Sequence, residues 1–254
     1  MEKEYNRVIP FESIANFRDL GGYKGRGGRT TAWRRLYRSG GLLHMTAADK
    51  AFLKNDIQLK TVIDLRSPEE PKKLQEIRLL EEIGARYFNV QFKWPVVDYY
   101  KKEIELYAST SNMGVVYLHR IRHEGFAKRL FTILEIMADQ QYYPLLFHCG
   151  AGKDRTGVLA AMVLKLVGVA DEDVIRDYVL TDPSMEDVKK RICSDPETSD
   201  EVRNLPDFTW RAPPQFMATF LNGLREEYGS AAGYLKKYGA EKTLVPRLEK
   251  ALLV

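Results

Sequence analysis

Short apolar runs alternate with longer helical patterns through the middle of the chain. A β-branched run predicts a buried strand at Leu59–Arg66, an alternating pattern predicts a second strand at Arg86–Phe92, and a short apolar run predicts a buried strand at Pro144–His148. Helical periodicity fills most of residues 101–139 and returns after residue 154. This alternation predicts an α/β fold with a central, mostly parallel sheet flanked by helices.

The first strand is followed by residues that predict where a helix begins and ends. Ser67 is a favourable N-cap, Pro68 suits the first helical position, and Glu70 completes a capping box. The helical pattern continues to Ile83, and Gly84 then predicts the stop. The connection between the first two strands is therefore predicted to be helical.

The remaining chain reads as helical with one interruption. Residues 101–139 predict two or three helices, and residues 155–168 are apolar on nearly every side, which predicts a buried helix. Helical patterns dominate from residue 171 onward, except for the polar segment 194–208, which predicts a loop. Without a repeat or a linker, we expect one domain over residues 1–254, with extra helices before residue 144 and at the C-terminus.

Composition narrows the class of protein. The 254 residues are 44% hydrophobic and 29% charged, and a net charge of +4 is too small to indicate nucleic-acid binding. No apolar run approaches the length of a membrane span, and the first residues lack the apolar segment of a secretory signal. Two cysteines, Cys149 and Cys193, make no disulfide framework. We expect a cytoplasmic monomer without membrane insertion or nucleic-acid partner; secretion into a host is not shown by the sequence.

One stretch, FHCGAGKDRTG, combines features that a packed core does not need. It runs from Phe147 to Gly157, between a predicted buried strand and a predicted buried helix. Its small residues allow consecutive backbone N–H groups to curl around an anion, and the helix that begins near Arg155 adds the positive end of its dipole. The stretch therefore predicts an anion site at the place where α/β folds put such sites.

A nucleotide-binding P-loop is one alternative for this stretch. That motif requires G-x-x-x-x-G-K-[ST], and Gly152–Lys153 supplies its central pair. The position of the first glycine holds Phe147, and the position of the Ser or Thr holds Asp154. Both ends of the motif fail, so this alternative is rejected.

The second interpretation makes Cys149 a nucleophile. A thiolate among N–H donors at a helix N-terminus has a lowered pKa and reacts at neutral pH. Arg155, six positions later, can hold two phosphate oxygens, and Thr156 can donate its hydroxyl to the sulfur. An inert buried cysteine is the alternative, but His148 and the arginine at fixed spacing favour attack on phosphorus.

The stretch HCGAGKDRTG matches the H-C-x5-R-[ST] signature and resembles the protein-tyrosine phosphatase superfamily. A narrower resemblance is to the bacterial tyrosine and dual-specificity phosphatase branch that contains mycobacterial PtpB and listerial LipA. It implies a phosphatase-type fold, a cysteinyl-phosphate intermediate, no metal or other cofactor, and activity on phosphotyrosine, phosphoserine or phosphothreonine, and phosphoinositides. The motifs behind it are NFRDLGGY (Asn16–Tyr23), RLYRSGGL (Arg35–Leu42), VIDLRSPEE (Val62–Glu70), GKDRTG (Gly152–Gly157) and EEYGSAAGYLKKYG (Glu226–Gly239).

The resemblance places Cys149 and Arg155 in catalysis and the rest of the loop around the substrate phosphate. We interpret Lys153 as a contact to additional phosphate on the substrate, with a solvated surface lysine as the alternative. The substrate-binding set is His148, Gly150, Ala151, Gly152, Lys153 and Thr156.

Three aspartates are candidates for the general acid that protonates the leaving oxygen. Asp64 ends a predicted central strand and matches the aspartate that the resemblance implies is the acid, although it could simply pair with Arg66. Asp154 lies in the loop, where it could instead cap the helix, and its basic neighbours should keep it ionised. Asp98 ends WPVVD, which resembles the W-P-D loop of the wider superfamily but contains two extra residues. We rank Asp64 first, Asp154 second and Asp98 third.

Other segments have plainer interpretations. NFRDLGGY predicts a turn at Gly21–Gly22, with Arg18 and Asp19 paired structurally, and the basic run 24–38 predicts a solvated face or a surface that steers anionic substrates. His119 and His123 lie four apart, but no third ligand is evident, so no metal site is expected. We expect Cys193 to pack rather than to form a regulatory disulfide with Cys149.

Two other classes of protein share parts of this pattern. A catalytically dead phospho-binding relative would typically have lost the cysteine or the arginine, and both are present. A rhodanese-like sulfurtransferase would not need His148 before the cysteine or Arg155–Thr156 after it. The sequence therefore favours a cysteine-dependent phosphatase.

Overall fold

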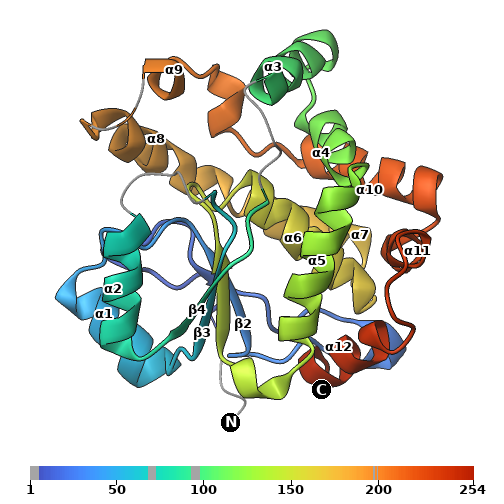
Figure 1. Ribbon diagram of the computed structural model, residues 1–254, viewed down its shortest axis with the longest axis horizontal. Coiled ribbons are helices and arrows are strands. Elements are labelled where there is room, and N and C mark those ends of the chain that lie inside the picture. Colours follow the sequence, from blue (N-terminus) through green and yellow to red (C-terminus); the bar gives the residue numbers. More distant parts are fainter. Residues whose placement is uncertain (1–5, 68–72, 93–97, 197, 199) are drawn as a thin grey trace.

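A five-stranded sheet forms the centre of the protein. The computed structural model describes residues 6–67, 73–92, 98–196, 198 and 200–254. The strand order is β1-β2-β5-β3-β4; β1 runs antiparallel to β2, and the other neighbours are parallel, which confirms the predicted mostly parallel sheet (Figure 1). The strands are β1 (Arg18–Asp19), β2 (Leu36–Ser39), β3 (Thr61–Asp64), β4 (Arg86–Asn89) and β5 (Leu145–His148).

Both faces of this sheet are covered, which explains why its central strands read as continuous apolar runs. On β5, Leu146 packs into one core, whereas Leu145 and Phe147 pack into a larger core on the opposite face. Figure 1 shows α1 (Ala47–Phe52) and α2 (Lys73–Ile83) on the first face and the remaining helices on the second face or beyond the sheet.

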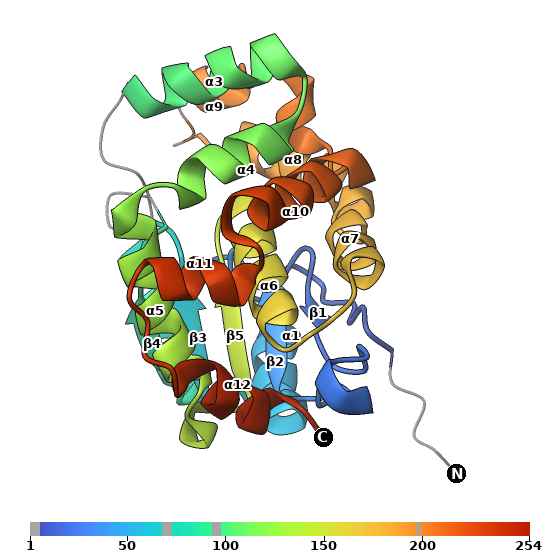
Figure 2. The ribbon, with the colours of Figure 1, turned by 90° about the vertical axis from the view of Figure 1, so that its right-hand side faces the viewer.

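In the described residues, three α-helices lie between β4 and β5, within the predicted two or three, and a further series follows β5 (Figure 2). The prediction of a loop over residues 194–208 is wrong in part, because a short helix, α9 (Asp200–Arg203), and a 3₁₀ turn, Asp207–Trp210, interrupt this segment. The helices are α3 (Asp98–Thr110), α4 (Met113–Ile121), α5 (Glu124–Met137), α6 (Asp154–Leu166), α7 (Asp171–Val179), α8 (Met185–Ser194), α9 (Asp200–Arg203), α10 (Pro214–Tyr228), α11 (Ala231–Lys237) and α12 (Leu244–Leu252).

The end of α2 confirms one of its two predicted boundaries. Ile83 is its last residue, and Gly84 follows with a φ of 78°, the left-handed conformation expected after a helix. The predicted start, at Pro68 and Glu70, lies outside the described residues.

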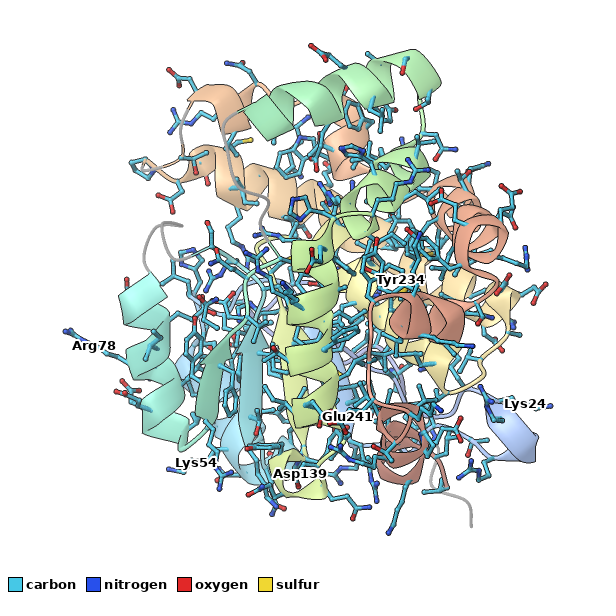
Figure 3. All side chains as sticks on the ribbon, turned by 45° about the vertical axis from the view of Figure 1, so that its right-hand side comes forward. Lys24, Lys54, Arg78, Asp139, Tyr234 and Glu241 are labelled. Carbon is cyan, nitrogen blue, oxygen red and sulfur yellow. The ribbon has the colours of Figure 1, made fainter. Side chains whose placement is uncertain are left out.

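Strands β1 and β2 were not predicted from the sequence. The sequence predicts a solvated or steering surface for the basic run 24–38, yet this run ends in β2, where Tyr37 and Arg38 are buried. The abundance of basic residues hides the apolar positions of this strand. Part of the interpretation holds, since Lys24 is exposed and points away from the body of the molecule (Figure 3).

Candidate active site

The cysteine-containing loop joins β5 to α6. His148 is the last residue of β5, and Asp154 is the first residue of α6. The loop thus lies at the carboxyl ends of the parallel strands and at the N-terminus of a buried helix, as the sequence predicted.

Residues outside the loop donate hydrogen bonds to its carbonyl groups. Gly150 O accepts a hydrogen bond from Gly41 N at 2.8 Å. Gly152 O accepts one from Asn16 Nδ2 at 3.0 Å and another from Arg38 Nη2 at 2.8 Å. These contacts turn the carbonyl oxygens toward the surrounding protein.

The N–H groups of the loop are not bound in the same way. Within the part of the chain that the structure describes, the backbone N–H groups of residues 150–153 donate no hydrogen bond to another residue. Gly152 has a φ of 69°, and a Cβ at this position would lie 2.5 Å from Ser39 O, so only glycine fits here. Outward carbonyls and inward N–H groups form an anion-binding nest.

The sulfur and the guanidinium of the signature lie at this nest. Cys149 is 3% exposed, and Thr156 Oγ1 donates a hydrogen bond to its Sγ at 3.1 Å. Arg155 Nη2 lies 4.0 Å from the position that a Cβ on Gly150 would occupy, so this side chain folds back over the loop. The structure brings the predicted nucleophile, hydroxyl donor and phosphate-binding arginine together.

A buried charged network supports the loop from behind. Asp177 of α7 accepts from Arg18 Nε at 2.9 Å and from Arg38 Nη1 at 2.6 Å. Arg18 also donates to the side chain of Asn16, and both Asn16 and Arg38 hold Gly152 O. The network therefore connects α7 and two strands to the carbonyl groups of the loop.

The predicted structural role of the NFRDLGGY segment is confirmed by its contacts. Arg18 pairs with Asp177, and the carboxylate of Asp19 accepts from Gly21 N at 2.8 Å and from Arg34 N at 2.7 Å. Burial raises the pKa of Asp19 to about 6, against the lowering effect of these two backbone N–H groups.

A second buried cluster lies beside His148. His148 Nδ1 is 3.2 Å from Cys149 O, and its Nε2 is 3.2 Å from Glu76 Oε1. Arg66 Nη2 contacts Glu76 at 2.8 Å and Asp64 at 2.9 Å. Asp64, Glu76 and His148 offer atoms within 4.8 Å of one another, but a metal ion there would have to displace the guanidinium that already bridges both carboxylates.

The first-ranked acid, Asp64, is buried and paired with Arg66. Its carboxylate is fully buried and accepts from the backbone and guanidinium of Arg66 and from Tyr87 Oη at 2.7 Å. Burial raises the pKa of Asp64, but His148 and Arg66 outweigh this effect and hold the pKa far below its ordinary value. The geometry shows the alternative, a strand-end residue paired with Arg66, and the acid role of Asp64 stays a prediction.

Asp154 occupies a different environment. Its side chain is 25% exposed, and Oδ1 accepts from Tyr117 Oη at 2.6 Å and lies 3.5 Å from Lys153 Nζ. Burial raises the pKa of Asp154, but Lys153, Arg120 and the tyrosine hydroxyl outweigh it, so the net pKa lies below its ordinary value. The predicted ionised state agrees with this direction. Asp98 begins α3, and its side chain lies outside the described residues.

The interpretation of Lys153 as a substrate contact is not supported by its position. The side chain is fully buried, and Nζ donates to Thr209 O at 2.6 Å and to Phe208 O at 3.3 Å. The ammonium is thus held by the 3₁₀ turn before α10, because these carbonyls and Asp154 satisfy its charge. Lys153 joins the loop to this turn.

Two smaller expectations concern the histidine pair and Cys193. His119 lies in α4, whereas His123 caps α5 by accepting from Gly125 N at 3.1 Å, so the helix ends between the two histidines. Cys193 is a free cysteine that packs with the cluster containing Trp210, as expected.

Several supporting residues were not assigned a role from the sequence. Asn16 and Arg38 belong to motifs that the resemblance marked, which was the available signal. No local pattern marks Asp177, Tyr117 and Glu76, because the partners of these three residues lie far away in the chain.

A cysteine in an N–H nest, with an arginine folded over it, defines a cysteine-loop phosphatase site on an α/β fold. A family model described as the tyrosine phosphatase family matches residues 9–254, and the chain belongs to this family. In the ranges that the structure describes, every helix is too short or too polar to cross a lipid bilayer.

Comparisons with individual proteins agree with the family. A protein of Cupriavidus necator, provisionally named a tyrosine-protein phosphatase, is 34% identical over 190 residues, which cover 67% of this chain and 62% of that protein. The triple specificity protein phosphatase PtpB of Mycobacterium tuberculosis is 30% identical over 157 residues, 58% of this chain and 56% of PtpB. The matched stretches thus span less than two thirds of either relative.

A solved structure is similar at a lower level. The core catalytic domain of the PP-IP phosphatase SIW14 from S. cerevisiae has a TM-score of 0.43 and 19% identity, covering 79% of this chain and 89% of that domain.

Proposed function

We propose that this chain is a single-domain, cysteine-dependent phosphatase that hydrolyses phosphotyrosine through a cysteinyl-phosphate intermediate. The observation that carries the proposal is the loop itself: its carbonyls are bound from outside, its N–H groups are not, and Thr156 donates to the sulfur of Cys149. Such a nest suits the three equatorial oxygens of a phosphoryl group in transfer.

In the proposed reaction, the Cys149 thiolate attacks phosphorus while Arg155 and the loop N–H groups hold the equatorial oxygens. The bond from phosphorus to the leaving oxygen breaks, and that oxygen takes a proton from a carboxylic acid. Water then attacks the cysteinyl phosphate and returns a proton to the carboxylate. The thiolate leaves, and inorganic phosphate is released.

We assign the acid to Asp154 instead of Asp64. Asp154 adjoins Arg155 and is partly exposed, whereas Asp64 is fully buried and its carboxylate is engaged by Arg66 and Tyr87. A resting Asp154 is ionised, but a phosphate dianion bound beside it raises its pKa and favours the protonated form that the first step needs.

The test of the activity is hydrolysis of p-nitrophenyl phosphate with and without vanadate. We expect turnover that vanadate inhibits and that Cys149→Ser abolishes. Turnover by the cysteine variant would refute the proposal. Peptides with phosphotyrosine or phosphoserine and a phosphoinositide then compare the substrate classes that the resemblance to the PtpB branch implies.

The test of the acid compares Asp154→Asn with Asp64→Asn across pH. Loss of the acid should remove the basic limb of kcat and reduce the rate far more with phenyl phosphate than with p-nitrophenyl phosphate, whose leaving group needs little protonation. We expect this pattern from Asp154→Asn. The same pattern from Asp64→Asn alone would restore Asp64 as the acid.

A further inference from the structure

Two buried tyrosine hydroxyls lie behind the carboxylate of Asp154. Tyr117 Oη donates to Asp154 Oδ1 at 2.6 Å and lies 2.8 Å from Tyr178 Oη. A hydroxyl has one hydrogen, and that of Tyr117 is used on Asp154, so Tyr178 donates to Tyr117. The result is a directed chain from Tyr178 through Tyr117 to Asp154.

This chain is shielded from solvent. Tyr117 and Tyr178 are fully buried, and the Tyr117 ring packs edge-on against Phe220 of α10. Water therefore cannot replace either hydroxyl without repacking the core. Burial and the nearby Asp154 raise the pKa of Tyr117 well above its ordinary value, so its hydroxyl remains a donor at every working pH.

Charged and hydroxyl groups around Asp154 come from its own loop and helix, from α4 and from α7. Arg120 of α4 faces the carboxylate and is itself bound by Glu103 of α3 at 2.6 Å. The set that faces Asp154 is Lys153 and Arg155 from its own loop and helix, Tyr117 and Arg120 from α4, and, through Tyr117, Tyr178 from α7. Of these groups, Tyr117 can be changed without altering a charge.

We propose that Tyr117, polarised by Tyr178, is a positioning residue that orients the Asp154 carboxyl and favours its ionised form. The proposal rests on the proposed function and on Asp154 as the acid. The hydroxyl holds one carboxylate oxygen, while the side chain of Asp154 stays partly exposed. The two-hydroxyl chain strengthens the bond, since hydrogen bonds in series polarise one another.

The test is the pH dependence of kcat for Tyr117→Phe and Tyr178→Phe, with phenyl phosphate and p-nitrophenyl phosphate as substrates. Tyr117→Phe removes a hydrogen bond to the charged carboxylate of Asp154, so the basic limb of kcat should move to higher pH by about one pH unit. Tyr178→Phe should move it by less, in the same direction. Tyr117→Phe should also slow phenyl phosphate more than p-nitrophenyl phosphate, because a misplaced acid matters most for the poorer leaving group.

Tyr234→Phe is the matched control. Tyr234 lies on α11 (Figure 3). It is also fully buried and also donates its hydroxyl, to Ile121 O at 2.7 Å, a contact on the main chain that involves no carboxylate. It should cost similar stability and leave the basic limb in place. Thermal unfolding of the three variants separates a folding defect from a change in the acid, and Tyr178→Phe carries the test if Tyr117→Phe does not fold.

The outcomes separate this inference from its premises. An inactive wild-type protein would overturn the proposed function and this inference with it. A basic limb that survives in Asp154→Asn would overturn Asp154 as the acid. If Asp154→Asn removes the limb but both tyrosine variants leave it unmoved, or if Tyr234→Phe moves it equally, the positioning role is wrong and the tyrosines only pack.

Discussion

Asp177→Asn should weaken both the fold and the active-site loop. Asp177 is buried between Arg18 and Arg38, which it contacts at 2.9 and 2.6 Å, and Arg38 in turn holds Gly152 O. Asparagine has nearly the same shape but no charge, so two guanidinium groups would stay buried without their counter-ion.

Two routes give the size of the effect. The guanidinium groups outweigh the effect of burial and lower the pKa of Asp177 from 3.8 to about 2, which corresponds to a stabilisation on the order of 2 kcal/mol at neutral pH. Breaking a buried ion pair by removing one partner costs about 3–5 kcal/mol. Because asparagine keeps a side-chain oxygen, we expect a loss of about 3 kcal/mol in the free energy of unfolding.

The pH dependence has a defined sign. A carboxyl whose folded pKa is depressed stabilises the fold fully above its unfolded pKa and loses this contribution as the pH falls through the folded value. The difference in stability between wild type and Asp177→Asn should therefore be constant near neutral pH and should shrink from about pH 4 toward pH 2.

Urea unfolding at pH 7 measures the effect, and Asp171→Asn provides the control. Asp171 begins the same helix and also has two basic partners, Lys165 at 2.5 Å and Arg225 at 3.0 Å, but it is 23% exposed. Its loss should cost less than about 1 kcal/mol. Asp177→Asn should also reduce kcat/KM by about tenfold or more, since the loop loses its alignment. Equal stability losses in the two variants would refute the reasoning.

The remaining predictions concern the loop chemistry. Cys149→Ser should fold normally and lose essentially all activity, because serine cannot ionise there at neutral pH; retention of more than about a tenth of kcat would argue against covalent catalysis. Dialysis against a chelator should leave kcat/KM unchanged, and abolition that a divalent ion reverses would move the function to another class. Lys153→Met should reduce turnover of a phosphotyrosine peptide and of a phosphoinositide equally, because the buried ammonium binds Phe208 O and Thr209 O; a selective loss on the lipid would restore Lys153 as a substrate contact.

The parts of the fold that could be predicted are those with local signals. Strand β3 is apolar and β-branched, β5 is apolar, β4 begins an alternating segment, and α6 is apolar on nearly every side, so their type and order follow from pattern alone. Strand β2 places Leu36 in the larger core and Tyr37 in the smaller one, but basic neighbours obscure this pattern. The burial of one of them, Arg38, depends on Asp177, some 140 residues away, and on Gly152 O. Tertiary pairing, not local propensity, decides such a strand.

The same distinction explains the outcome for the acid. Asp64 and Asp154 both stand at ends of elements near the cysteine, and local sequence places them equally well. A tyrosine from a distant segment donates to each carboxylate, Tyr87 to Asp64 and Tyr117 to Asp154. What separates the two aspartates is exposure: Asp64 is fully buried, whereas the side chain of Asp154 is 25% exposed. Partners from distant segments set the exposure and ionisation of a carboxyl, so its role cannot be read from its position alone.

The inward N–H groups of the loop require the outer network. A loop can present consecutive N–H groups to an anion only if its carbonyls point elsewhere, and buried carbonyls must be bound. Here the donors come from Asn16, Gly41 and Arg38, all far from the loop in sequence. Asn16 is bound by Arg18, and Arg38 is bound to Asp177, so buried charge is a consequence of building the nest. The short signature supplies the chemistry, and the scattered N-terminal motifs supply the donors that keep it in shape.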